Sequence, residues 1–448
     1  MKFSKFGQKF TQPTGISQLM DDLGDALKSD QPVNMLGGGN PAKIDAVNEL
    51  FLETYKALGV DNDAGEANSS AIISMANYSN PQGDAAFIDA LVGFFNRHYD
   101  WNLSAENIAL TNGSQNAFFY LFNLFGGAFA DEKSQDKESQ SIDKSILLPL
   151  TPEYIGYSDV HVEGQHFAAV LPHIDEVTHD GEAGFFKYRV DFEALENLPA
   201  LKEGRIGAIC CSRPTNPTGN VLTDEEMAHL SEIAERYEIP LIIDNAYGMP
   251  FPNIIYSDAQ LSWDNNTILC FSLSKIGLPG MRTGIIVADA KVIEAVSAMN
   301  AVVNLAPTRF GAAIATPLVN DDRIKQLADN EIKPFYQKQA TLAVKLLKDA
   351  LGDYPLMIHK PEGAIFLWLW FKDLPISTLE LYERLKEKGT LIVPSEYFFP
   401  GVDVSNYQHA HECIRMSIAA DEQTLTDGIK VIGEVVRELY DEANSQNY

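Results

Sequence analysis

The middle of this chain alternates between short apolar runs and helix-like segments, and this alternation restricts the fold more than any other feature. The runs are SILLPL (145–150), IGAICCS (206–212), IPLIIDN (239–245), TILCFS (267–272) and TGIIVA (283–288). They are nearly continuous in apolar residues, which is typical of strands buried on both faces of a sheet. One connecting segment begins with a capping box, in which Thr223 caps a helix and Glu226 follows three residues later. The pattern predicts an α/β fold with a mostly parallel sheet covered by helices.

The pattern of apolar runs and helical segments changes after residue 320. A long helical stretch over 321–351 leads into the runs GAIFLWLWF (363–371), LIVPS (391–395) and CIRMSIA (413–419), and a last helix begins near Glu422. The alternation of these strands with helices predicts a smaller α+β domain at this end of the chain.

We therefore expect three parts along the chain. An N-terminal segment over 1–50 packs on the small domain, a large domain spans 51–320, and the small domain spans 321–448. Two polar stretches, 60–70 and 130–145, show no apolar periodicity and are predicted to be solvated loops.

Composition and charge exclude several classes of protein. The chain has 448 residues and a formal net charge of −28, so a nucleic-acid backbone would be repelled over most of its surface. No apolar run approaches the length of a membrane span, and MKFSKFGQKF at the N-terminus lacks the apolar core of a secretory signal. The four cysteines have no metal-ligand spacing and are typical of small buried residues in a reducing compartment. We expect a cytoplasmic protein that binds no metal, nucleic acid or membrane.

The commonest nucleotide, serine-hydrolase and zinc-protease signatures, GxGxxG, GxxxxGK[ST], GxSxG and HExxH, do not occur in the sequence. Polar residues gather instead at the carboxyl ends of the predicted strands, where open α/β sheets bind ligands. The first group, TNGSQN, places Gly113, Ser114 and Gln115 in a glycine turn before a strongly apolar helix. Free backbone N–H groups at such a turn would bind a phosphate, and a plain helix N-cap is the alternative.

Two further motifs follow buried strands. SRPTNPTGN holds Asn216 between two prolines, in a turn that would aim its side chain into a cleft, with ordinary turn chemistry as the alternative. PLIIDNAYG ends a strand with Asp244, and Tyr247 follows three residues later. A carboxylate at a buried strand end is costly unless it meets a cation or hydrogen-bond donors. Asp244 therefore either faces a cationic ring or caps the next helix.

The motif SLSKIGLPGMRTG (272–284) places a single lysine, Lys275, among serines and glycines at the end of an apolar strand. A free lysine is protonated at neutral pH, but an apolar strand end, a nearby arginine and a cofactor aldehyde would favour a Schiff base. Ser272, Ser274 and Arg282 would then donate to a phosphate. The alternative is a structural ion pair between Lys275 and Asp244.

Together these motifs resemble those of the fold-type I pyridoxal-phosphate (PLP) aminotransferases of the class I/II group. The landmarks are NYSNPQG (77–83), NPTGN (216–220), DNAYG (244–248), SLSKIGLPGMRTG and CIRMS (413–417). The resemblance covers nearly the whole chain. It implies the PLP-dependent transferase fold, PLP as the cofactor, and a cofactor-binding domain over 51–320.

The resemblance also implies roles around the cofactor. Lys275 resembles the lysine that forms the Schiff base and moves a proton between substrate and cofactor, and Asp244 resembles the carboxylate that keeps the pyridine nitrogen protonated. Tyr247 and Asn216 match the donors to the cofactor's phenolate oxygen, and Tyr154 in PEYIGY would stack on the ring. The implied phosphate cradle comprises Gly113, Ser114, Gln115, Ser272, Ser274 and Arg282.

Further matches concern the substrate and a second subunit. Arg415 resembles the arginine that binds the substrate α-carboxylate through two parallel hydrogen bonds, and its apolar neighbours predict a buried strand rather than a surface edge. Gly39, in GGGNP, would let the backbone approach that carboxylate, and Asn216 completes the implied substrate-binding set. Tyr78 resembles the residue that reaches the phosphate of the neighbouring subunit, so a homodimer with shared sites is implied.

The implied reaction transfers the amino group between L-valine, or a similar small aliphatic amino acid, and pyruvate, giving 3-methyl-2-oxobutanoate and L-alanine. LGGGNP, PEYIGY and HKPEGAIFLWLWFKDLP are most similar to family members with this activity. Arg309, Arg323 and Arg384 lack a motif that would bind a second carboxylate, so the residues themselves indicate only a small, neutral amino acid.

Several alternatives remain for the same residues. The aromatic residues of FFYLF (118–122) and EYFFPG (396–401) either line an aliphatic pocket or belong to the core. A C–S β-lyase, or an aminotransferase with another amino acid preference, would use the same PLP site. A binding protein without cofactor would leave Lys275 and Asp244 as a structural pair.

Overall fold

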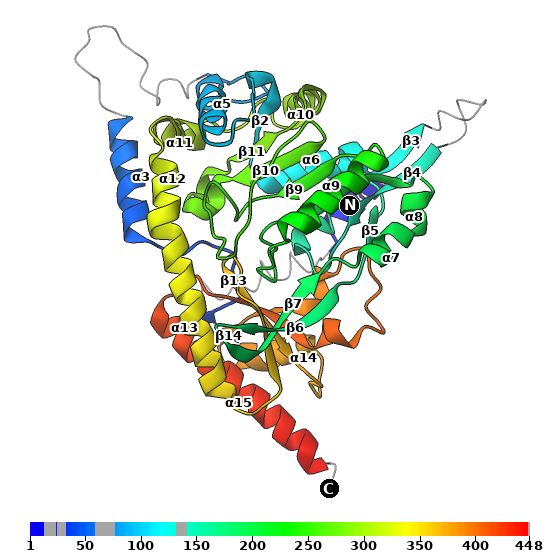
Figure 1. Cartoon of the computed structure of the whole chain (residues 1–448), viewed down its shortest axis with the longest axis vertical. Helices are drawn as coiled ribbons and strands as arrows, with labels where there is room; N and C mark the ends of the chain where they lie inside the picture. The colour runs from blue at the N-terminus through cyan, green and yellow to red at the C-terminus, as the bar shows by residue number, and fades with distance from the viewer. Residues whose placement is uncertain (13–23, 25–32, 59–76, 131–140, 447–448) are drawn as a thin grey trace. The chain divides into compact units, whose positions relative to one another are not determined.

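The computed structural model describes residues 1–12, 24, 33–58, 77–130 and 141–446 (Figure 1). The chain divides into two compact units, each built from separate segments. The first unit comprises Met1–Asn40, Phe125–Leu222 and Tyr336–Tyr448, and the second comprises Pro41–Leu124 and Thr223–Phe335. The domain ranges 1–50, 51–320 and 321–448 stay a prediction. The predicted loop at 60–70 lies outside the described residues.

The second unit contains four neighbouring strands in the order β2 (Ile108–Thr111), β11 (Gly284–Val287), β10 (Thr267–Ser272) and β9 (Leu241–Asp244). β9 and β10 run parallel, whereas β11 is antiparallel to both β10 and β2. Every residue of these strands is buried, as their continuous apolar runs predict. Ser272, Gly284 and Thr111 pair in register, so the polar and small residues of three strands meet at one edge.

The helices of the second unit include one whose start was predicted in detail. α9 (Asp224–Arg236) begins with the capping box: Glu226 N donates to Thr223 Oγ1 (3.1 Å) and Thr223 N donates to Glu226 Oε2 (2.8 Å). The other helices are α3 (Asp45–Ala57), α5 (Ala85–Tyr99), α6 (Ser114–Phe125), α10 (Ala290–Val303), α11 (Phe310–Asn320) and α12 (Arg323–Leu327). Short helical turns lie at η1 (Ala105–Asn107), η3 (Leu273–Ile276), η4 (Pro279–Met281) and η5 (Ala328–Ile332).

One sheet of the first unit has six strands, in the order β15 (Val393–Pro394), β16 (Cys413–Ser417), β13 (Phe366–Phe371), β12 (Leu356–His359), β7 (Glu182–Arg189) and β6 (His173–His179). β12 runs parallel to β7, and the other pairs are antiparallel. The runs predicted at 363–371 and 413–419 are confirmed as strands over 366–371 and 413–417. The hairpin of β6 and β7 was not predicted, because β6 is mostly exposed and β12, which pairs with β7, lies far along the chain.

The first unit also contains the neighbouring strands β8 (Ile206–Ser212), β4 (Ser141–Leu148) and β3 (Gly127–Ala130), with β5 (Phe167–Ala169) beside β4. β4 is parallel to β8 and β5 and antiparallel to β3. The loop predicted over 130–145 was therefore wrong for Ala130, which ends β3, and for residues 141–145, which belong to β4; residues 131–140 lie outside the described residues. Ile142 pairs with Phe129, and burial alternates along this polar segment, so pairing with β3 compensates for its low apolar content.

The first unit is completed by a parallel pair, β1 (Asn34–Met35) with β14 (Thr390–Leu391), and by helices. The helices are α1 (Lys5–Phe10), α7 (Phe192–Asn197), α8 (Pro199–Lys202), α13 (Lys333–Leu351), α14 (Thr378–Glu387) and α15 (Glu422–Gln446), with turns η2 (Ile155–Tyr157), η6 (Ser395–Phe398) and η7 (Gln408–His411). All four cysteines are free and buried, as predicted. Within the described ranges, no helix combines the length and the apolar character needed to cross a membrane.

Candidate active site

Asp244 and Tyr247 lie where β9 ends in the second unit. Both side chains are buried, at 8% and 5% exposure. Asp244 Oδ1 accepts a hydrogen bond from Ala246 N (3.0 Å) within a turn, and no helix begins at this point of the described chain for Asp244 to cap. Burial raises the pKa of the Cys270 thiol, whose residue pairs with Asp244 across the strands, and the negative charge of Asp244 raises it further. The strand end is thus a buried position that carries a carboxylate.

Lys275 lies on η3, directly after the end of β10. Ser272 starts this turn, with its Oγ accepting from Ser274 N (3.1 Å). Gly277 follows with φ of +114°, and a Cβ there would fall 2.6 Å from Val47 Cγ1, so only glycine fits. The Lys275 Nζ lies 5.4 Å from the centre of the Tyr247 ring. The structure therefore brings the predicted lysine and tyrosine together although they come from different strand ends.

The predicted phosphate residues of the second unit also converge. α6 begins at Ser114, directly after Gly113, whose φ is +87°. A Cβ on Gly113 would fall 2.3 Å from Arg282 Nη2, so the guanidinium lies against the glycine backbone. Arg282 Nη1 is 3.4 Å from Ser274 Oγ. A helix N-terminus, an arginine and two serine hydroxyls in one place form an arrangement that suits a phosphate group.

Two residues that the sequence reading missed hold this cradle together. Thr308 N donates to Asn112 Oδ1 (2.8 Å), and Thr308 Oγ1 is within hydrogen-bond distance of the carbonyl oxygens of Met281 (3.2 Å) and Arg282 (3.4 Å). Asn304 Nδ2 donates to Tyr120 of α6 (2.8 Å). No local motif marks these residues, because each acts through partners distant in the sequence.

Arg415 lies in the first unit, in the middle of β16. It is 3% exposed, which confirms the predicted buried strand. Nη1 donates to Asn216 Oδ1 (2.9 Å) and Nη2 donates to the carbonyl of Gly37 (2.7 Å). The guanidinium carbon lies 4.1 Å from the centre of the Phe366 ring. The structure therefore brings Arg415 together with Asn216, and the hydrogen bond to the glycine-rich segment is made by Gly37, two residues before Gly39.

Tyr154 and the turn that carries Asn216 share an anchor in the first unit that the sequence reading missed. Glu153 is 1% exposed, and its carboxylate accepts from Ser212 N (2.9 Å), Ser212 Oγ (2.6 Å) and Tyr154 N (3.2 Å). A buried carboxylate with three donors is well satisfied. The glutamate in PEYIGY, among apolar residues, was the available signal.

Tyr78 lies in the second unit and is 82% exposed. Its segment is tied down by Arg309, which donates from Nε and Nη2 to Asp84 Oδ2 (2.9 and 2.7 Å) and from Nη1 to the carbonyl of Asn77 (3.4 Å). An exposed tyrosine on an anchored segment is available to a neighbouring molecule.

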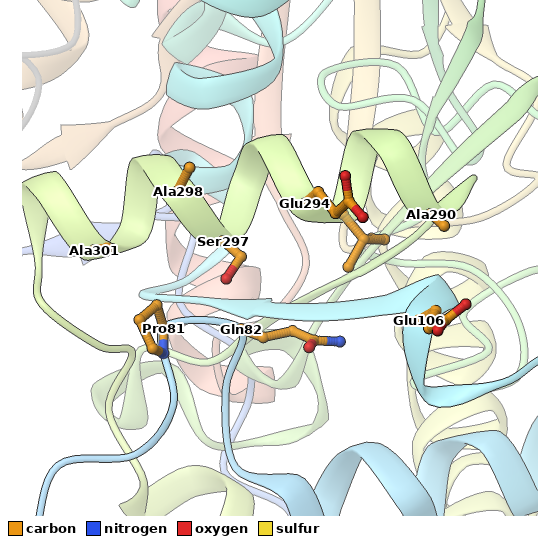
Figure 2. A pocket seen from close by; sticks show the side chains of 9 residues that line it. Pro81, Gln82, Glu106, Ala290, Glu294, Ser297, Ala298 and Ala301 are labelled. Atoms are coloured by element: carbon orange, nitrogen blue, oxygen red, sulfur yellow. The ribbon is translucent and has the colours of Figure 1, made fainter.

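A separate cavity of about 490 Å³ lies in the second unit between α10 and the turn at Pro81 and Gln82 (Figure 2). Glu106, Glu294 and Ser297 also line it, and none of the predicted site residues does. Among the described residues, no group of three or more His, Cys, Asp or Glu side chains is arranged to hold a metal ion.

Comparisons with known proteins agree with the resemblance seen in the sequence. The family model described as "Aminotransferase class I and II" matches residues 176–432. The valine–pyruvate aminotransferase of Escherichia coli (strain K12) is 44% identical over 445 residues, covering 99% of this chain and 100% of that protein.

Solved structures give the same result. A crystal structure of a Psychrobacter arcticum 273-4 protein is 93% identical, with a TM-score of 0.95, and covers 98% of this chain and 99% of that one. The valine–pyruvate aminotransferase of Salmonella typhimurium LT2 is 43% identical, with a TM-score of 0.82, and covers 95% of this chain and 100% of that one. The predicted fold is confirmed, and the chain belongs to the aminotransferase class I and II family, whose cofactor is pyridoxal phosphate.

Proposed function

We propose that this aminotransferase exchanges the amino group between L-valine, or a similar small aliphatic amino acid, and pyruvate, giving 3-methyl-2-oxobutanoate and L-alanine. Relatives of 44% and 43% identity over nearly the whole chain bear the name of this activity. The structural observation that carries the proposal is the buried guanidinium of Arg415, held by Asn216 and Gly37.

The residues of the second unit fit pyridoxal phosphate. We assign its phosphate to the cradle formed by Gly113, Ser114, Gln115, Ser272, Ser274 and Arg282, where a side chain on Gly113 would displace the arginine. Asp244 provides a buried carboxylate for the ring nitrogen, and Tyr247 a hydroxyl for the phenolate oxygen. In the first unit, Asn216 would donate to the same oxygen and Tyr154 would cover the ring. When bound, the cofactor supplies an electron sink for the bond that breaks at the substrate Cα.

Lys275 is the proposed base. Its Nζ would take the proton from the substrate Cα and pass it to the cofactor, and it would move a proton the opposite way when the keto acid is converted to an amino acid. The Nζ lies 5.4 Å from the centre of the Tyr247 ring, so the amine is beside the residue proposed to contact the cofactor's phenolate oxygen. Asp244, the last residue of its buried strand, would place its negative charge opposite the ring nitrogen.

Arg415 is the proposed carboxylate-binding residue. Guanidinium binds carboxylate through two parallel hydrogen bonds, which fixes the orientation of the substrate as well as its charge. Phe366 lies under the guanidinium and Phe398 has its ring centre 5.3 Å from it, so water is excluded from two sides. Gly39, close in sequence to Gly37, is proposed to approach the same carboxylate through its backbone.

Three arginines later in the chain than Lys275 support a neutral substrate side chain. Arg309 pairs with Asp84, Arg323 with Asp321 and Arg384 with Glu380, so each already serves a carboxylate of the protein. The aromatic run 118–122 lies on α6, where Phe118, Tyr120, Leu121 and Phe122 are buried core residues. The aliphatic preference therefore rests on the named relatives and on the apolar surroundings of Arg415.

Two further parts of the proposal concern assembly and location. Tyr78 would reach the cofactor phosphate of a second copy, so the enzyme would act as a homodimer. The ranges 1–50, 51–320 and 321–448 would be its N-terminal segment, cofactor domain and small domain, and the protein would work in the cytoplasm.

The test uses the purified protein and its visible absorption. We expect a yellow protein whose band shifts when L-valine is added and returns with pyruvate. Lys275→Ala should abolish the shift, whereas Lys291→Ala, an exposed lysine of the same unit, should leave it intact. A colourless protein, a band that ignores L-valine, or release of sulfide from L-cysteine would contradict the proposal, and the last outcome would indicate a β-lyase.

A further inference from the structure

A buried ion pair in the first unit has no part in the chemistry proposed above. Lys187, on β7, and Glu362, between β12 and β13, are 3% and 4% exposed. Lys187 Nζ donates to Glu362 Oε2, and Glu362 Oε1 lies 3.6 Å from Lys360 Nζ. Removing two charges from water is expensive, and apolar residues in such a place are often at least as stabilising. The pair therefore needs an explanation other than stability.

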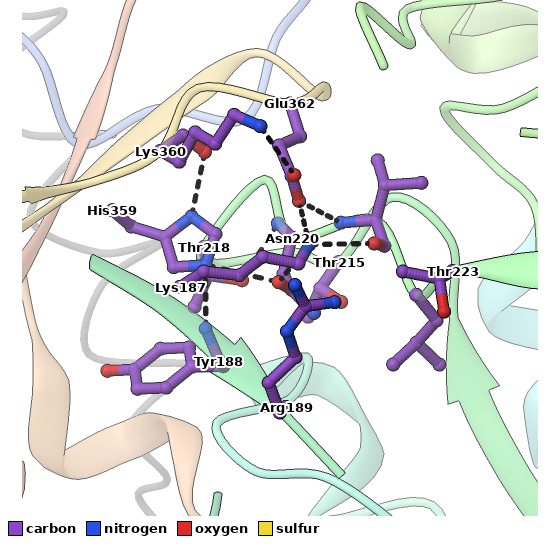
Figure 3. A network of polar contacts seen from close by, with 12 residues as sticks. Lys187, Tyr188, Arg189, Thr215, Thr218, Asn220, Thr223, His359, Lys360 and Glu362 are labelled. Carbon is purple, nitrogen blue, oxygen red and sulfur yellow. Dashed lines mark hydrogen bonds and ion pairs between the residues drawn. The ribbon is translucent and has the colours of Figure 1, made fainter. Parts of the chain in front are cut away.

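The pair is built into the turn that carries Asn216 (Figure 3). Lys187 Nζ also donates to Asn220 Oδ1 (3.2 Å) and to the carbonyl of Val221 (3.0 Å). Val221 N in turn donates to Glu362 Oε2 (3.1 Å). Both members of the ion pair therefore hydrogen-bond to the same end of the turn, at Asn220 and Val221.

Hydrogen bonds within the turn couple the position of Asn220 to that of Asn216. Thr215 N donates to the carbonyl of Asn220 (2.8 Å), and Gly219 N donates to the carbonyl of Thr215 (2.8 Å). Gly219 has φ of +73°, and a Cβ on it would fall 2.6 Å from the carbonyl oxygen of Gly363, the residue after Glu362. A shift of the Glu362 loop would therefore move the whole turn, including Asn216.

Asn216 connects the turn to the proposed substrate site, because its Oδ1 accepts from Arg415 Nη1 (2.9 Å). We propose that Lys187 and Glu362 are positioning residues, which set Asn216 and through it the orientation of the Arg415 guanidinium toward the substrate carboxylate. This inference rests on the proposed role of Arg415. It predicts that the ion pair affects carboxylate binding through Asn216, beyond any effect on folding.

A double-mutant cycle between Lys187→Met and Asn216→Ala tests this. The probe is 3-methylbutanoate, which has the carbon skeleton of L-valine without the amino group, titrated into the holoenzyme by calorimetry. We expect Lys187→Met to weaken binding by about 10- to 100-fold, since small misplacements of a binding group have effects of that size. The double variant should bind the probe no more weakly than Asn216→Ala alone. Lys187 is proposed to act on Arg415 only through Asn216, so both substitutions break the same connection. KM for L-valine should rise with the same pattern, and kcat should change less.

The matched control is Lys388→Met, which removes a lysine from an exposed pair with Glu438 (3.0 Å) in the same unit. It should leave binding unchanged. Unchanged binding in Lys187→Met, or effects that multiply in the double variant, would overturn the inference. If Lys187→Met does not fold, Lys187→Met/Glu362→Gln leaves no lone buried charge and is judged by the same cycle. A wild-type enzyme that neither binds the probe nor uses L-valine would instead refute the proposed function, and the inference with it.

Discussion

Gly113→Ala offers a direct measurement of the proposed phosphate cradle. The added Cβ would fall 2.3 Å from Arg282 Nη2 and 2.8 Å from its Cζ, distances that real Cβ atoms do not show. The guanidinium must therefore shift away from the glycine backbone. The glycine also has φ of +87°, a conformation that costs an alanine about 1–2 kcal/mol.

The two costs have different consequences. The backbone cost lowers the stability of the second unit, whatever is bound there. The displacement of Arg282 would remove the charged hydrogen bond that we propose it donates to the phosphate, worth about 1.5–3 kcal/mol. That loss corresponds to a rise of about 10- to 150-fold in the dissociation constant of pyridoxal phosphate.

The assay strips the cofactor from the protein and titrates pyridoxal phosphate back, following visible absorption, with urea denaturation in parallel. Gly280→Ala is the matched control, because its Cβ would meet nothing within 4 Å and the residue lies two positions from Arg282. We expect Gly280→Ala to bind the cofactor as the wild type does. A Gly113→Ala protein that loses stability yet keeps full cofactor affinity would refute the assignment of Arg282 to the phosphate.

Three other predictions follow from the described contacts. Arg415→Lys keeps the charge but loses the two-pronged geometry, so KM for L-valine should rise about 10- to 100-fold in steady-state kinetics, and an unchanged KM would contradict the proposed role. Burial raises the pKa of Cys270 and Cys413 well above the usual thiol value, so a disulfide reagent at about pH 8 should label the native protein far more slowly than the denatured one, and equal labelling would contradict their burial. Burial lowers the pKa of His409 to about 3. As the pH falls below about 6.5, this histidine therefore takes up a proton in the unfolded chain but stays neutral in the folded chain, which favours unfolding. The urea midpoint should therefore drop over that range, and His409→Gln should flatten the slope by up to about 1.4 kcal/mol per pH unit.

Local signals in the sequence predicted the parts of the fold that depend on neighbouring residues. The capping box at Thr223 and Glu226 is present atom for atom, and the apolar runs around residues 243, 269 and 286 are buried strands. Arg415 was predicted to be buried because its strand is apolar on both sides, and the structure confirms this.

Features that depend on distant partners were not predictable in this way. The hairpin of β6 and β7 joins its sheet through Ile358 and His359, whose strand lies in the last quarter of the chain. Lys187 is the instructive case. A lysine inside the run GFFKYRV signals a buried cation, but its partner Glu362 is not identifiable without the fold. Residues 141–145 became a strand for the same reason, since β3 provides the pairing that their composition does not.

The discontinuous make-up of the two units has a consequence for synthesis on the ribosome. The second unit ends at Phe335, so its segments, with Lys275 and Asp244, have all been translated while more than a hundred codons remain. The first unit cannot complete its fold until the last part of the chain has been translated, because Asn34 pairs with Thr390 and the carbonyl of Gly37 accepts a hydrogen bond from Arg415. A nascent chain that stalls before Cys413 would therefore carry the residues of the second unit that we propose bind the cofactor, but it would lack Arg415, the residue proposed to bind the amino acid.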